Sequence, residues 1–474
     1  MGTPLDYLGS VHFASGPEQS DLETDGCAAV RVDANQAWRL TEAWCKSRSV
    51  GWGLHQARAR LGKSLEELGP GIITGAADDD PSGIATYSQA GAQFGYGLLW
   101  TLILTYPLMS AVQLISAHIG RVTGAGLAKN LRAAFPGWLV TTLVAILLVA
   151  NIFNIGADLA AMAAAAALVA GGGEHLFVAA FALVCVSLQL FVPYRRYAQL
   201  LKWLTLTLFA YVAVVLLVRV DWPAALVGMI WPRDLGQSAI LTVVAVFGTT
   251  ISPYLFFWQS AQEAEEVATS TAKPLKRSPR SAPRQFRRIR IDTFVGMAFS
   301  NLIALAIIIA TAATLHARGI TDIRTAADAA LALRPIAGQF AFALFAVGII
   351  GTGLLAIPVL AGSAAFAVSE VGGWREGLEY KPRQAIHFYA VIVAATLIGV
   401  VLELSHLDPI KALFWSAVLN GVAAVPIMAA MMLLGSRKSV MGRFTERRGL
   451  LLFGWAATGV MGAAAIAMLI DLAG

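Results

Sequence analysis

Long apolar stretches separated by short polar ones repeat along most of this chain. At ~20 residues each, eleven of these stretches are long enough to cross ~30 Å of hydrocarbon as helices. They cover residues 70–92, 97–119, 137–169, 174–193, 199–219, 237–262, 291–314, 336–368, 386–403, 408–434 and 449–472. The pattern predicts an all-α polytopic membrane domain over residues 67–474, preceded by a polar cytosolic extension over residues 1–66.

The composition favours the same class of protein. Of 474 residues, 57% are apolar and only 14% are charged, as in membrane proteins that face a lipid bilayer. The formal net charge of +6 raises the question of nucleic-acid binding, but the basic residues fall in loops between the spans, where topology explains them. The sequence therefore predicts that the protein contacts the lipid bilayer and does not bind nucleic acid.

The loop charges predict the orientation. Of the 35 Lys and Arg residues, 29 lie in the N-terminal tail and in the loops on the same side as the tail. Because basic loops stay on the cytosolic side, we expect a cytosolic N-terminus and an outside C-terminus. An Ala- and Arg-rich composition points to a multi-pass protein of a cell membrane, specifically a bacterial inner membrane.

The most basic loop covers residues 265–290, between the sixth and the seventh predicted span. It holds eight Lys and Arg residues among Pro and Ser. The favoured interpretation is a solvated linker that sets topology, and the alternative is a contact with anionic lipid or a regulatory partner.

Two spans carry a helix-breaking motif at matching places. The first span, in spans 1–5 (about 70–219), contains Asp80-Pro81-Ser82-Gly83, and the sixth, in spans 6–11 (about 237–472), contains Ser252-Pro253. A spacing of five spans places the two breaks in opposite orientations across the membrane. Inverted repeats with discontinuous first helices are typical of secondary transporters. We therefore predict a transmembrane transporter domain with a LeuT-like fold, a 5+5 inverted repeat plus an eleventh transmembrane helix.

The breaks offer oxygen ligands only. Asp80 supplies a carboxylate, the carbonyls near Ala77 and Thr249 lose their helical partners at the prolines, and Ser252 adds a hydroxyl. Oxygen ligands suit Mg²⁺ or Mn²⁺. The competing interpretations are that Asp78, Asp79 and Asp80 cap the following helix and that Ser252 only forms a kink.

Other spans carry isolated polar residues. Asp158 is a lone acid in the third span, one turn after Asn154, and an intramembrane acid commonly faces a water-filled path or a polar partner. Asn301 in the seventh span and Asn420 in the tenth interrupt apolar sequence, and interhelical packing is the favoured role for both. We expect these residues to support the site or the pathway.

The two broken spans together resemble the Nramp divalent-metal transporters over residues 68–472. The second motif reads Thr-Ile-Ser-Pro-Tyr-Leu-Phe-Phe-Trp-Gln at 250–259. In that family the breaks read Asp-Pro-Gly-Asn and Ala-x-x-Met-Pro-His, and the aspartate, the asparagine, the methionine sulfur and two carbonyls hold a transition metal. The resemblance implies that Asp80 is the ligand aspartate and that Ala77 and Thr249 supply the carbonyls.

The sequence departs from that pattern at four positions. Gly83 stands where the asparagine is expected, Ser252 replaces the methionine, and Tyr254 replaces a histidine implicated in proton handling. The proton-path pattern Asp-Leu-Ala-Glu of the third span appears as Asp158-Leu-Ala-Ala161. This combination resembles the Nramp-related magnesium transporter branch, which implies movement of hydrated Mg²⁺, and also Mn²⁺, without protons.

The sequence thus favours a transporter that takes up Mg²⁺ and Mn²⁺ by alternating access, with the metal as substrate and no cofactor. One alternative is a proton-coupled Mn²⁺/Fe²⁺ symporter in which Asp80 and Asp158 carry protons. A second is an amino-acid or amine symporter of the same fold, in which Asp80 pairs with an ammonium group. An intramembrane aspartyl protease would not explain the break in the sixth span, so we do not expect an enzyme.

Overall fold

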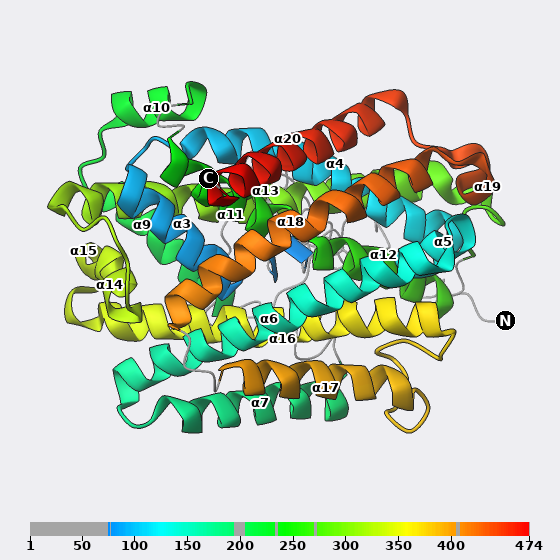
Figure 1. Ribbon diagram of the computed structural model, residues 1–474, viewed down its shortest axis with the longest axis horizontal. Coiled ribbons are helices and arrows are strands. Elements are labelled where there is room, and N and C mark those ends of the chain that lie inside the picture. Colours follow the sequence, from blue (N-terminus) through cyan, green and yellow to red (C-terminus); the bar gives the residue numbers. More distant parts are fainter. Residues whose placement is uncertain are drawn as a thin grey trace, which may run out of the picture. The chain divides into compact units, whose positions relative to one another are not determined.

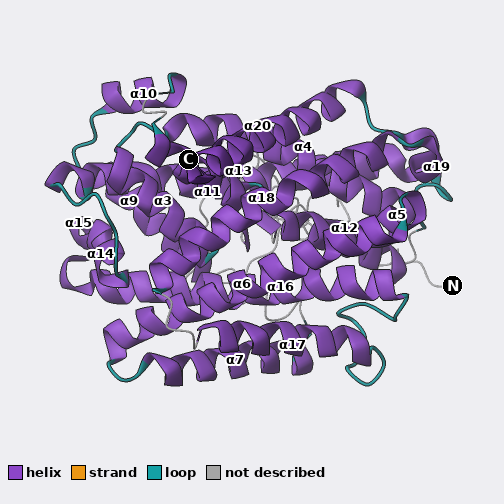
Figure 2. Cartoon of the chain, in the orientation of Figure 1, coloured by secondary structure: helices purple, strands orange, loops and turns teal. Residues whose placement is uncertain are grey.

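A computed structural model describes residues 74, 75, 77–193, 204–232, 236–269, 273–403 and 408–473. All of them belong to one compact unit, Glu66–Gly474, and the predicted extension over residues 1–66 lies outside the described residues. Figure 2 shows helices joined by loops, and no strand occurs among the described residues.

The helices that match the predicted spans are α3 (Pro81–Phe94), α4 (Leu99–Thr123), α6 (Gly137–Ala170), α7 (Glu174–Phe191), α9 (Phe209–Leu217), α11 (Gln237–Thr250), α12 (Pro253–Thr269), α13 (Ala282–Thr314), α16 (Ala341–Gly372), α17 (Ile386–Glu403), α18 (Pro409–Ser436) and α20 (Arg448–Ala473). Shorter helices in the connections are α5 (Leu127–Ala134), α10 (Trp222–Ile230), α14 (Ala326–Ala330), α15 (Arg334–Ala337) and α19 (Lys438–Met441), and 3₁₀ turns include η1 (Leu204–Leu208) and η6 (Gly442–Phe444).

The predicted all-α membrane fold is confirmed. In the described part of the chain, nine helices are long and apolar enough to cross a membrane. The described part of the fifth predicted span forms η1 and α9, and its first residues, 199–203, lie outside the described residues. Hydropathy misses the short connecting helices because they are brief or amphipathic. It also misses the polar start of α13, which begins at Ala282 inside the segment predicted as a basic loop.

Both predicted breaks are present. In the sixth span, α11 ends at Thr250 and α12 begins at Pro253, with Ile251 between them at φ −116° and ψ 60°. In the first span, α3 begins at Pro81, and Asp80 is extended at φ −71° and ψ 170°. Proline explains both starts, because its ring fixes φ and it has no amide hydrogen to donate at the first helical turn.

The broken helices are held by close packing of small residues. A Cβ atom on Gly421 of α18 would lie 2.8 Å from the carbonyl oxygen of Val244 and 3.3 Å from the Cα of Gly248, both on α11. The helices α6 and α16 also pack against each other along their lengths, as Figure 1 shows. Small side chains at such contacts let helix backbones approach closely inside a membrane.

Replacing Gly421 with Ala should destabilise the protein by about 1–3 kcal/mol, because the new methyl group overlaps the backbone of α11. The matched control is Gly459→Ala in α20, where nothing lies within 4 Å of the added Cβ. Thermal unfolding in detergent measures both variants. Equal unfolding midpoints for the two would contradict the proposed contact between α11 and α18.

Candidate metal site

Asp80 lies at the start of α3 with its carboxylate fixed by local hydrogen bonds. Its Oδ1 accepts from the hydroxyl of Ser82 and from the backbone N–H of Gly83, each at 2.7 Å. Asp80 is therefore the N-cap of α3, and its Oδ1 makes the hydrogen bonds that the capping interpretation predicts. Oδ2 takes no part in the cap and faces other helices.

The second carboxylate oxygen of Asp80, Oδ2, lies close to residues of two other helices, α12 and α6. The hydroxyl of Tyr254, on α12, lies 3.4 Å from Asp80 Oδ2 and 3.2 Å from the carbonyl oxygen of Ala77. The amide nitrogen of Asn154, on α6, lies 3.5 Å from the same carboxylate oxygen. These contacts are long for hydrogen bonds, and one hydroxyl proton serves only one acceptor at a time. Lone pairs of Asp80 and Ala77 thus remain available to a ligand.

Thr249 reaches the same place from the other break. A Cβ atom on Gly83 would lie 3.1 Å from Thr249 Oγ1 and 3.5 Å from Asp80 Oδ1, so the glycine leaves the threonine beside the carboxylate. Thr249 Oγ1 is buried and has no hydrogen-bond partner among the described residues. The two predicted breaks therefore meet through Asp80, Gly83 and Thr249.

Ser252 is turned toward its own helix. Its hydroxyl lies 2.8 Å from the carbonyl oxygens of both Gly248 and Thr249, which lose their helical partners where α11 ends. The kink interpretation therefore describes the serine's hydrogen bonds in this structure. The serine oxygen keeps its acceptor lone pairs, and the Thr249 carbonyl oxygen keeps the lone pair that does not accept from the serine.

Asp78 and Asp79 lie apart from the cap and share one partner. The hydroxyl of Ser300, on α13, lies 2.6 Å from Asp78 Oδ2 and 3.0 Å from Asp79 Oδ1. The other oxygen of each carboxylate has no hydrogen-bond partner among the described residues. Sequence reasoning missed Ser300 and named its neighbour Asn301; the available signal was a serine on the buried stripe of α13.

The remaining predicted residues lie on the helices around this point. Asp158, on α6, is fully buried, neither of its oxygens has a partner among the described residues, and its charge interacts with that of Asp80. Asn420, on α18, is also fully buried, and both polar atoms of its amide lack a described partner. Asn301 is only half-buried on α13. The structure thus places Asp158 near the site and leaves Asn301 at its margin.

Four carboxylates are buried in this part of the molecule without a basic partner. Asp78, Asp79, Asp80 and Asp158 are each at most 1% exposed, and none joins an ion pair found among the described residues. A buried charge is very costly unless it is neutralised. No group of three or more His, Cys, Asp or Glu side chains in the described part of the chain has the arrangement of a metal cage. The geometry suits a cation held by one carboxylate with neutral oxygens.

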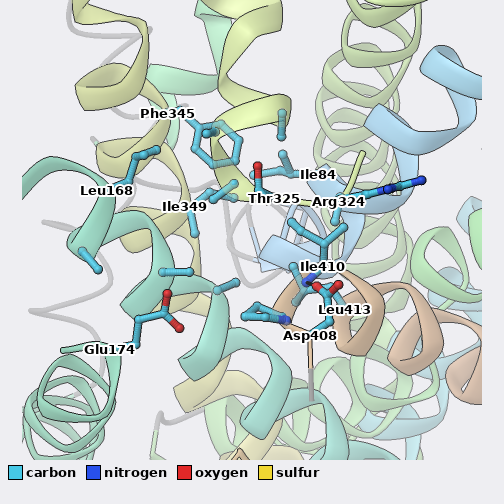
Figure 3. Close-up of a pocket in the computed structure, with 18 residues that line it drawn as sticks. Ile84, Leu168, Glu174, Arg324, Thr325, Phe345, Ile349, Asp408, Ile410 and Leu413 are labelled. Carbon is cyan, nitrogen blue, oxygen red and sulfur yellow. Dashed lines mark hydrogen bonds between the residues drawn. The ribbon is translucent and has the colours of Figure 1, made fainter. Parts of the chain in front are cut away.

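A cavity of about 500 Å³ lies next to the site. Ile84 and Ala85, one turn beyond Asp80 on α3, line part of it, and apolar residues of α6, α16 and α18 form half of its lining. Figure 3 shows the charged residues Glu174, Arg324 and Asp408 among its lining. The cavity therefore connects the end of the molecule that carries α14 with the helix that Asp80 begins.

Known proteins share both the sequence pattern and the fold. The family described as "Natural resistance-associated macrophage protein-like" matches residues 71–471. The divalent metal cation transporter MntH of Deinococcus radiodurans is 26% identical over 403 residues, which cover 82% of this chain and 86% of that protein. The MntH protein of Burkholderia ambifaria is 27% identical over 463 residues, covering 92% and 95% of the two.

Two solved structures show the same fold at low identity. A variant of the Eremococcus coleocola manganese transporter superposes with a TM-score of 0.70 at 19% identity, covering 86% of each chain. A nucleobase-cation-symport-1 family transporter superposes with a TM-score of 0.53 at 12% identity, covering 85% of this chain and 92% of the other. The predicted LeuT-like fold is confirmed.

Replacing Asp80 with Asn should weaken Mg²⁺ and Mn²⁺ binding at least tenfold while the unfolding temperature stays close to that of the wild type. Asn caps a helix as well as Asp does, but it lacks the charge that a divalent ion requires. Calorimetric titration measures the binding. Asp221→Asn, at the N-cap of α10, is the matched control and should bind normally. Unchanged affinity in Asp80→Asn would exclude Asp80 as a ligand.

Proposed function

This chain belongs to the Nramp family, and we propose from that premise that it moves divalent metal cations across a cell membrane by alternating access. The observation that carries the proposal is the meeting of Asp80 with the Ala77 carbonyl and Thr249 at two broken helices. A cation there would satisfy both a buried carboxylate and carbonyls that the breaks release.

We propose Mg²⁺ as the preferred substrate and Mn²⁺ as a second one. The ligands around Asp80 are oxygen atoms, and Ser252 stands where the resemblance implies a methionine sulfur. Mg²⁺ dehydrates reluctantly and keeps several waters. The hydroxyls of Tyr254 and Thr249 and the amide of Asn154 surround Asp80 and would accept or donate hydrogen bonds to such waters. This arrangement favours a partly hydrated ion over a softer, dehydrated one.

The transport would run from the cavity side toward the end that carries α5 and α19, with a cytosolic N-terminus and a C-terminus outside. The cavity beside α3 would admit the ion from outside, and Asp79, Asn301 and Asn420 would support the site or the path. An inside-negative potential supplies the driving force: a divalent ion gains about 4.6 kcal/mol over 100 mV, at ~2.3 kcal/mol for each charge. Protons are not required, since Tyr254 and Ala161 stand where the resemblance implies proton-handling residues.

One observation favours a second candidate, a proton-coupled Mn²⁺ symporter. Asp158 is buried, has no hydrogen-bond partner among the described residues and interacts electrostatically with Asp80. A carboxylate in that position would be able to carry a proton that leaves as the metal arrives. The curated relatives are named for divalent metal cations and the solved one for manganese, which fits either candidate.

Purified protein in liposomes should take up Mg²⁺ and Mn²⁺ without acidifying the interior, because no proton site is coupled to the metal. Uptake is followed with metal-sensitive dyes, and internal pH with a second dye. Cd²⁺ should compete weakly, since the described residues around Asp80 offer oxygen ligands and no sulfur. Metal-dependent acidification would favour the proton-coupled symporter. Uptake of amino acids without uptake of metals would contradict the proposal that the substrate is a metal ion.

Replacing Ser252 with Met should shift selectivity toward Cd²⁺ and Mn²⁺ and reduce Mg²⁺ uptake severalfold, because a thioether favours softer ions. Ser252→Ala separates the two effects of this change: it also removes the hydroxyl that bonds the Gly248 and Thr249 carbonyls but adds no sulfur. Competition between metals during uptake gives the selectivity. If Ser252→Met and Ser252→Ala gave the same metal selectivity, the side chain at position 252 would not face the ion.

A further inference from the structure

Tyr87 of α3 brings a phenol ring to the metal site from inside the bundle. It follows Gly83 by one helical turn, so the two residues lie on the same face of α3. Long side chains in a helix lean back toward its N-terminus, which for Tyr87 is the direction of Asp80. The tyrosine is 0% exposed. Its ring therefore extends through the interior of the protein toward the carboxylate.

Gly83 shows what this ring meets. A Cβ atom on Gly83 would lie 3.1 Å from Thr249 Oγ1, 3.3 Å from Tyr87 Cε2 and 3.5 Å from Asp80 Oδ1. Groups from both broken spans thus surround one point beside the glycine. The contact with the tyrosine would be shorter than the ~3.5–4.0 Å of a relaxed carbon–carbon contact. The ring therefore takes space that a side chain at position 83 would need.

The pair of Gly83 and Tyr87 changes the kind of polar group at this place. The family resemblance implies an asparagine at position 83, whose amide oxygen would reach the metal directly. Gly83 supplies no side chain, and the phenol of Tyr87 arrives from the next turn of the helix instead. A neutral phenol oxygen accepts hydrogen bonds, so it suits a water molecule bound to the metal.

The hydroxyl of Tyr87 has accepting capacity left. It is buried and has no hydrogen-bond partner among the described residues. Thr250, at the end of α11, lies close to it but donates its own proton to the carbonyl oxygen of Val246. The charge of Asp80 also acts on the phenol. The lone pairs of Tyr87 Oη are thus available to a donor beside the carboxylate.

We propose that Tyr87 is a specificity-determining residue of the metal site, because it accepts a hydrogen bond from a water molecule that the ion retains. Water bound to a cation turns its oxygen to the metal and points both hydrogens outward, so a hydrated ion needs acceptors around it. Thr249 Oγ1, which also has no described partner, would accept the second hydrogen of the same water. This role rests on the proposed function, since it requires that the ion binds at Asp80.

The role makes the site selective for the ion that keeps its water. Mg²⁺ dehydrates reluctantly, so it depends on acceptors that lie beyond its own ligands. The hydroxyl of Tyr87 touches the water and not the metal, so its removal weakens binding of a hydrated ion more than binding of a dehydrated one. A tyrosine that only packed α3 against α11 would change the stability of the protein and the affinities for all ions alike.

Replacing Tyr87 with Phe keeps the ring and removes only the hydroxyl. Full-length protein in detergent is titrated calorimetrically with MgCl₂ and, separately, with MnCl₂. The variant should bind Mg²⁺ about tenfold more weakly, the effect of one lost hydrogen bond in a charged site. It should bind Mn²⁺ no more than about threefold more weakly, because Mg²⁺ gives up its waters more reluctantly.

The matched control is Tyr211→Phe in α9, a buried tyrosine whose hydroxyl also has no hydrogen-bond partner among the described residues. It should bind both ions as the wild type does, and thermal unfolding shows whether each variant folds. A second variant, Thr249→Val, keeps the backbone carbonyl and removes the other acceptor of the water. It should also weaken Mg²⁺ binding more than Mn²⁺ binding.

The variant Asp80→Asn separates this inference from the proposed function. If Asp80→Asn lost metal binding while Tyr87→Phe kept the wild-type ratio of Mg²⁺ to Mn²⁺ affinity, the role of Tyr87 would be overturned and the metal site would stand. An unchanged ratio in Thr249→Val would overturn the shared water in the same way. If Asp80→Asn bound both ions normally, the proposed function would fail and this inference with it.

Discussion

Four carboxylates are buried in the spanning helices without a basic residue to pair with them among the described residues, and the rest of the site is arranged around that constraint. Inside a membrane such charges are stable only with a cation or a proton nearby. Two prolines interrupt helices at the same place and release backbone carbonyls that also need a partner. One divalent cation at Asp80 would answer both needs there, for that carboxylate and for the released carbonyls, and we therefore propose this point as the transport site.

Sequence reasoning could locate the breaks because proline acts locally. Pro81 and Pro253 each begin a helix, and Asp80 caps the first one as its residue type predicts. The LeuT-like fold followed from the five-span spacing of the breaks. What sequence could not give were contacts across helices: the Ser300 hydroxyl between Asp78 and Asp79, and the Tyr254 hydroxyl between Ala77 and Asp80, depend on how helices far apart in the chain pack.

The structure gives a physical meaning to the departures from the pattern that the resemblance implies. Gly83 leaves room for Thr249 beside Asp80, which a larger side chain would crowd. Ser252 completes the end of α11 with its hydroxyl, a task that a thioether cannot perform. Tyr254 adds a hydroxyl at the carboxylate. Ser252 thus replaces a soft ligand with an oxygen, Gly83 leaves space, and Tyr254 supplies a hydroxyl, a combination that fits an ion that keeps part of its water.

The measurement that tests the central claim most directly is the anomalous X-ray signal of Mn²⁺ in crystals of the protein. The account predicts one strong peak within about 5 Å of the Asp80 carboxylate, allowing for a retained water layer, where α3 begins and α11 gives way to α12. A peak elsewhere in the membrane domain, with none at Asp80, would contradict the claim that the two broken helices form the transport site.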